Sequence, residues 1–172
     1  MKGLLCRRMD NIDKNSTPRM TYAQKLEAAK REKIHFDFDV LKATYPGVYC
    51  FYAFKNTEKT PFYVGKAFNI RSRMLDASDE GHVHCYLSGT KTTKLVQSKI
   101  KDYLDNDYEV HISLVKKVSM KCSCAAIAFN KLALTELQAI NSMQKNGYCL
   151  EQYPEGTKPN NIASWNEKYL TK

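Results

Sequence analysis

Two charged residues stand at helix positions where the sequence pattern calls for apolar side chains. Arg73 shares a helix face with Ile70 and Met74, and Glu136 falls on the apolar face of a helix predicted over Ala125 to about Met143. A guanidinium or a carboxylate on an inward face is costly unless it meets an opposite charge, a hydrogen-bond network or a metal. These two residues are therefore the first candidates for a site.

Arginine, glutamate and tyrosine together suit phosphoryl-transfer chemistry. A glutamate supplies an oxygen ligand for Mg²⁺, and an arginine stabilises the negative charge that develops on phosphate oxygens. A tyrosine near the metal could position or deprotonate the attacking water, and Tyr49 and Tyr63 lie in two predicted strands. The structural alternative is that the tyrosines only pack and that Arg73 and Glu136 form a buried ion pair. Neither a convincing Ser-His-Asp or Cys-His pattern nor a G-x-x-x-x-G-K-[ST] loop is present.

The elements that position these residues follow from the apolar spacing. Residues 47–54 are apolar on both faces, which predicts a central strand, and the turn at 55–61 leads into a second strand at 62–66. The remaining expected elements are a basic helix at 21–33, a linker at 35–45, a helix from Asn69 to about Ser78, a loop at 79–89, a helix at 92–104 and a half-exposed edge strand at 108–114. The core stripe expected on the long helix is Phe129, Ala133, Leu137, Ile140 and Met143.

This pattern predicts an α+β fold with a small, mostly antiparallel three-stranded sheet flanked by helices. We expect residues 1–44 to form an N-terminal extension with the basic helix, and residues 45–172 to form the catalytic domain. The basic helix either packs on the domain or reaches toward a phosphate backbone.

Composition favours a polyanionic partner only modestly. The 172 residues include 27 Lys and Arg against 18 Asp and Glu, a net charge of +9, and the sequence pI is about 9.2. No apolar run approaches the length of a membrane helix, and the first residues lack the pattern of a signal peptide. An intracellular, cytoplasmic protein is therefore expected.

The six cysteines are expected to be reduced and unligated thiols. A zinc set made of Cys122, Cys124, His82, His84 and Cys85 is the minor alternative, because its spacing differs from that of the usual structural zinc modules.

Two tripeptides and one arginine resemble the GIY-YIG nuclease superfamily. Gly47-Val48-Tyr49 and Tyr63-Val64-Gly65 are separated by one hairpin, and Arg73 follows ten residues after Tyr63. Glu136 on a later helix and Asn161 near the end match the remaining elements of the family. The resemblance spans about Tyr45 to Ala163, with Val in place of Ile in both tripeptides.

The resemblance implies a role for each matched residue. Tyr49 would be the general base or would orient the water, and Tyr63 would support the site near the phosphate. Arg73 would stabilise the scissile phosphate, and Glu136 would hold a single Mg²⁺ or Mn²⁺. Asn161 would brace the site through hydrogen bonds.

Four further residues are candidates for contact with nucleic acid. Gly65 would allow close backbone approach, and Lys66 is placed for a phosphate contact. Arg71 and Lys94 are the remaining two.

The sequence departs from the family at one position. Many members carry a histidine four residues after the arginine, where this chain has Ala77. Lys91, Lys94 or His84 could assist Tyr49 instead, and we rank Lys91 first.

The function that the resemblance implies is metal-dependent hydrolysis of DNA phosphodiesters by a stand-alone endonuclease of restriction or phage type. Its partner would be double-stranded DNA, which it would cut on both strands with some sequence selectivity, and a homodimer is compatible with one site cutting one strand. The alternatives are a homing or repair nuclease, RNA cleavage, and a non-catalytic nucleic-acid-binding module on the same fold.

Overall fold

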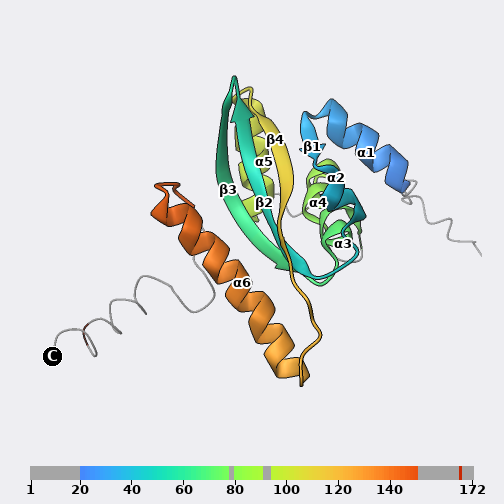
Figure 1. Cartoon of the computed structure of the whole chain (residues 1–172). Coiled ribbons are helices and arrows are strands. Elements are labelled where there is room, and N and C mark those ends of the chain that lie inside the picture. The colour runs from blue at the N-terminus through green and yellow to red at the C-terminus, as the bar shows by residue number, and fades with distance from the viewer. Residues whose placement is uncertain (1–19, 78–79, 91–93, 151–166, 168–172) are drawn as a thin grey trace, which may run out of the picture.

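A four-stranded mixed sheet forms the centre of the protein (Figure 1). The structure is a computed structural model that describes residues 20–77, 80–90, 94–150 and 167. The predicted α+β class is confirmed, but the predicted three-stranded sheet is wrong, because a short strand near the N-terminus adds a fourth. The strands are β1 (Ile34–Phe36), β2 (Gly47–Lys55), β3 (Glu58–Ala67) and β4 (Glu109–Lys117).

The strand order is β1-β4-β2-β3. β2 runs antiparallel to both of its neighbours, and its predicted central position is confirmed. β1 pairs with β4 in parallel, so β4 is not the edge strand that its sequence predicted. The three residues of β1 lie partly in the segment interpreted as a linker, and a strand of this length is too short to show an alternation of its own.

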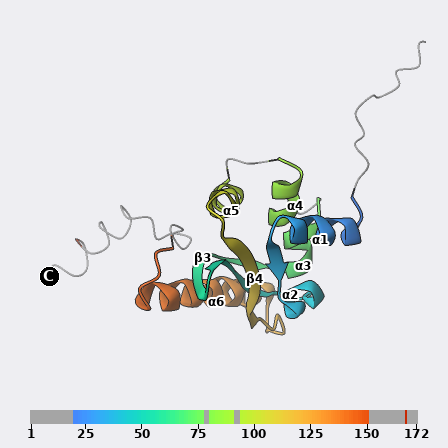
Figure 2. The same cartoon turned by 90° about the horizontal axis from the view of Figure 1, so that it is seen from above.

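Helices cover both faces of the sheet (Figure 2). They are α1 (Tyr22–Arg31), α2 (Phe38–Lys42), α3 (Ile70–Leu75), α4 (His82–Leu87), α5 (Leu95–Asp105) and α6 (Ala125–Lys145). The loop expected at 79–89 is wrong, because α4 lies within it. Val83 and Cys85 are buried, and Gly81 comes so close to α3 that a Cβ there would lie 2.7 Å from the carbonyl carbon of Met74. In the described part of the chain, no helix combines the length and the apolarity needed to cross a membrane.

Each face of the sheet packs against helices through its own apolar cluster. One joins the sheet to α1–α5 and includes Ala29, Ile34 and Val40 from the segment assigned to the N-terminal extension. The other joins the sheet to α6 through Leu132 and Ile140. The basic helix α1 therefore packs on the domain, which was the first of its two predicted placements.

The first half of the buried face of α6 is turned by about one residue from the prediction, whereas Ile140 is buried as predicted. Ala128, Leu132 and Ile140 are its buried residues, whereas Phe129, predicted in the core, is 55% exposed and packs edge-on against Phe68. Glu136 is four residues from both Leu132 and Ile140, so it lies on the buried stripe. The prediction that α6 carries a carboxylate toward the sheet is confirmed.

Candidate active site

The ring of Tyr49, a buried residue of β2, lies over Gly65 of the edge strand β3, which makes room for it. The two residues face each other in the β2–β3 pair. A Cβ on Gly65 would lie 2.5 Å from the hydroxyl oxygen of Tyr49 and 2.6 Å from its Cζ. Glycine is therefore needed here by the ring of Tyr49 itself, and contact between Gly65 and nucleic acid stays a prediction.

The hydroxyl of Tyr49 is hydrogen-bonded to His82. The distance from Oη to Nε2 is 3.0 Å, and both side chains are buried. Sequence reasoning missed this partner, because His82 was considered only as a zinc ligand and its segment was interpreted as a loop. Within the described residues, the Tyr49 hydroxyl thus has a hydrogen-bond partner at the first position of α4 that was not among the predicted candidates Lys91, Lys94 and His84.

Tyr63 and Arg73 complete the surroundings of this hydrogen bond. The ring of Tyr63 lies 6.4 Å from that of Tyr49 and 5.6 Å from that of His82. Burial raises the pKa of Tyr49 well above its ordinary range, and the guanidinium of Arg73 acts against this through its charge and a hydrogen bond. Burial also raises the pKa of Tyr63, and Arg73 again opposes the shift.

Glu136 brings a negative charge to the same site. Its carboxylate raises the pKa of Tyr49 and of Tyr63, after the larger effect of burial. Its Oε2 lies 2.5 Å from Nζ of Lys66, and the exposed fraction of the Glu136 side chain is 16%. Lys66, predicted to contact a phosphate, therefore neutralises the predicted metal ligand.

Glu136 is the candidate ligand for the predicted Mg²⁺ or Mn²⁺ ion, and its carboxylate is paired with Lys66. Mg²⁺ is commonly held by one or two carboxylates while it keeps several waters, and Glu136 offers a carboxylate with partial access to solvent. The ammonium of Lys66 already occupies a position where Glu136 attracts a cation.

His82 is held in the neutral form. Burial, followed by the positive charges of Arg73 and Lys94, lowers its pKa from 6.5 to about 3. A neutral imidazole with Nε2 facing a phenol accepts the hydroxyl proton when its Nδ1 carries the hydrogen. The pair therefore has the geometry in which a tyrosine hydroxyl can donate to a neutral imidazole.

The other predicted site residues have different surroundings. Lys94 pairs with Glu80 at 3.1 Å, and its charge acts on His82. Arg71 is exposed, with its guanidinium carbon 5.6 Å from the centre of the Tyr22 ring. The predictions for Lys91 and Asn161 lie outside the described residues.

The cysteines within the described residues form no disulfide bonds. The alternative zinc set is not assembled among the residues that the structure describes; there, the side chains within metal-ligating distance are His35, Glu109 and His111.

Comparison with known proteins gives this chain no relative: no family model, curated protein or solved structure matches it.

Proposed function

We propose that this protein is a divalent-metal-dependent DNA endonuclease of the GIY-YIG type. The observation that carries the proposal is that two charged residues, Arg73 and Glu136, both act on neighbouring tyrosines, Tyr49 and Tyr63, whose ring centres lie 6.4 Å apart. These residues come from β2, β3, α3 and α6, and the charges of Arg73 and Glu136 act on both tyrosines.

In this proposal Tyr49 takes the proton of the attacking water while its own phenolic proton passes to Nε2 of His82. The 3.0 Å hydrogen bond provides the path for the second transfer. His82 is a weak base in the free protein because Arg73 and Lys94 lower its pKa. Phosphates that approach these two cations offset their charge, so substrate binding makes His82 more basic.

Arg73 stabilises the negative charge that develops on the scissile phosphate, because a guanidinium donates paired hydrogen bonds to phosphate oxygens. Glu136 would hold the metal, which supplies charge neutralisation at the phosphate and a more acidic water. Lys66 then exchanges its ion pair with Glu136 for a phosphate contact. Tyr63, half-buried beside Tyr49, holds the ring in place.

A plasmid-nicking assay tests the proposal. Wild-type protein is expected to nick or linearise supercoiled DNA with Mg²⁺ and to be inactive with EDTA. Glu136→Ala is expected to abolish cutting, whereas the matched control Glu58→Ala, at an exposed position of β3, is expected to keep it. DNA binding without cutting by the wild type under any metal condition would favour a non-catalytic binding module, and preference for RNA would overturn the DNA assignment.

Arg73→Ala separates catalysis from binding. Loss of one electrostatic stabiliser of the transition state is expected to lower the cutting rate by about 10²–10³-fold, while DNA binding measured by gel shift remains. Equal loss of binding and of cutting would contradict the role given to Arg73.

We further propose that the protein is a sequence-selective endonuclease of restriction or phage type that cuts both DNA strands. Because one site cuts one strand, this part of the proposal is compatible with a homodimer. Sedimentation velocity with and without DNA, together with sequencing of the cut ends, tests it.

A further inference from the structure

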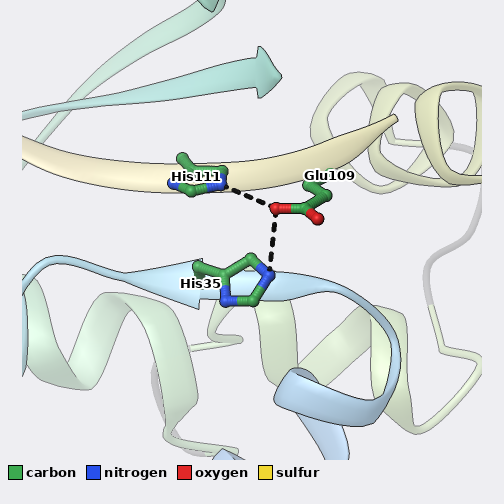
Figure 3. Close-up of side chains that lie close together, drawn as sticks. All are labelled: His35, Glu109 and His111. Atoms are coloured by element: carbon green, nitrogen blue, oxygen red, sulfur yellow. Dashed lines mark hydrogen bonds and ion pairs between the residues drawn. The ribbon is translucent and has the colours of Figure 1, made fainter. Parts of the chain in front are cut away.

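Two histidines and a glutamate meet at the edge of the sheet opposite the candidate active site (Figure 3). His35 of β1 is the register partner of His111 of β4, and Glu109 lies two residues before His111. Alternate residues of a strand point to one face. Ile34 and Val110 pack in the cluster with α1–α5, so His35, Glu109 and His111 project from the other face.

The three side chains converge on one point. Oε2 of Glu109 lies 3.4 Å from Nε2 of His35 and 3.2 Å from Nε2 of His111. The three ligand atoms all lie within 4.8 Å of one another. Charge-assisted N–H···O hydrogen bonds are usually about 2.7–2.9 Å long, so these contacts are long for hydrogen bonds.

The same distances fit ligands around a tetrahedral metal. Bonds of about 2.0–2.1 Å from zinc to imidazole nitrogen or carboxylate oxygen place neighbouring ligand atoms roughly 3.3 Å apart. Both nitrogen-to-oxygen distances to Glu109 agree with this value. The side chains of His35, Glu109 and His111 are 38%, 44% and 28% exposed, so an ion and a completing water have access.

We propose that His35, Glu109 and His111 bind one divalent transition metal of the Zn²⁺ class and that this ion fastens β1 to β4. Two imidazoles and one carboxylate select Zn²⁺ over Mg²⁺, which prefers oxygen ligands alone. β1 has three residues and pairs with one strand, so a bond to the metal from His35 adds a fixed connection between the N-terminal elements and the sheet.

The surroundings favour a neutral imidazole at His35. Burial and the neighbouring His111 lower the pKa of His35, while the charge of Glu109 acts in the opposite direction. The ring of Phe54 packs 5.1 Å from that of His111 and limits its movement. The positive charge of Lys30 also acts on His35 and would repel a bound metal ion. The negative charge of Glu109 offsets this repulsion.

The test uses the untagged full chain after removal of metal with EDTA. Competition with a chromophoric chelator is expected to give one saturable Zn²⁺ site in the presence of excess Mg²⁺. His35→Gln and His111→Gln are each expected to weaken it at least tenfold. His84→Gln, which removes a histidine from α4, and Glu136→Gln, which alters the candidate active site, are expected to leave it unchanged. A result in which His35→Gln binds Zn²⁺ like the wild type overturns the proposal.

Two further measurements do not depend on how the variants fold. The melting temperature of the wild type is expected to rise with Zn²⁺ concentration, because an ion that binds only the folded state stabilises it. The wild type with Co²⁺ is expected to show the visible bands of a four-coordinate nitrogen and oxygen site. Thiolate-to-metal absorption would assign the ion to cysteines such as Cys122 and Cys124 and overturn the proposal. None of these readouts requires nuclease activity.

Discussion

Two opposing effects act on the pKa of Tyr49. Burial raises the pKa of the phenol, whereas the guanidinium of Arg73 lowers it. His82, which carries no charge of its own, accepts the hydroxyl hydrogen when its Nδ1 holds the ring proton. A phenol in this setting loses its proton only when a second positive charge arrives or when His82 becomes more basic. Both changes accompany the binding of metal and DNA in the proposed function, so the proposal predicts that Tyr49 is activated only after both have bound.

Replacing His82 is expected to change how the stability of the protein depends on pH. The pKa of His82 is about 3 in the folded protein, against 6.5 as its ordinary value. Below pH 6.5 the unfolded chain binds a proton that the folded protein excludes, so stability is full above this pH and falls as the pH decreases toward 3. The slope is about 1.4 kcal/mol per pH unit from this group.

Denaturant unfolding at pH 7 and at pH 5 measures this effect. His82→Gln is expected to lose less stability than the wild type between the two values. His84→Gln serves as the control, because His84 is less buried and its pKa is lowered less far. Equal slopes for the wild type and His82→Gln would contradict the assignment.

Gly65→Ala tests the contact that places the ring of Tyr49. The added methyl group would lie 2.5 Å from the hydroxyl oxygen, so the ring or the strand must shift. Overpacking of this kind costs about 1–3 kcal/mol. Displacement of Tyr49 from His82 is expected to reduce cutting as well as stability. Gly147→Ala is the comparison: it places a methyl group in open space and strains only a backbone with φ of +86°, so it is expected to leave cutting intact.

At the scale of elements, α1 is fastened to α3 by Lys25. Its ammonium donates to the carbonyl oxygen of Leu75 over 2.5 Å in a buried position, so this lysine of the basic helix is not available to a phosphate. Lys25→Ala leaves that carbonyl without its partner and is expected to cost about 1–3 kcal/mol of stability. Lys30→Ala, on the exposed side of α1, is expected to change stability by less than about 0.5 kcal/mol. Thermal unfolding that ranks the two variants equally would contradict this role.

The elements with strong local patterns could be predicted from the sequence. The apolar run at β2 predicted a central strand. The position of Asn69 predicted a helix cap, and its side chain accepts a hydrogen bond from the backbone N–H of Ser72. The short elements could not be predicted. β1 has three residues, too few to show an alternation, and α4 lies between Gly81 and Gly89, which indicated a loop.

The contacts within the site were harder to predict than its members. Tyr49 and His82 are 33 residues apart, and Lys66 and Glu136 are 70 apart. The inward positions of Arg73 and Glu136 follow from helical spacing alone. The partner of each polar group depends on how β3, α4 and α6 pack together, and no local pattern encodes that arrangement.

At the scale of the whole molecule, the two polar sites lie at opposite edges of one sheet. β3 is the outer strand beside the candidate active site, and β1 is the outer strand at the proposed transition-metal site, with β4 and β2 between them. Such separation allows metal at the β1 edge to stabilise the N-terminal elements without changing the charge around Glu136. Loss of Zn²⁺ is therefore compatible with retained Mg²⁺-dependent chemistry in the proposed enzyme.

The excess of positive charge is expected to make DNA binding depend steeply on salt. The net charge is +9, and each cation that contacts a phosphate contributes a slope of about −0.9 to the logarithm of affinity against the logarithm of salt concentration. Arg71→Ala, which removes an exposed cation next to Arg73 on α3, is expected to make this slope shallower by about 1. Lys101→Ala is the matched control, because Lys101 is paired with Asp105 on α5. Fluorescence anisotropy of a labelled duplex between 50 and 200 mM salt measures both slopes, and an affinity that stays constant over this range would show that phosphate contacts do not hold the DNA.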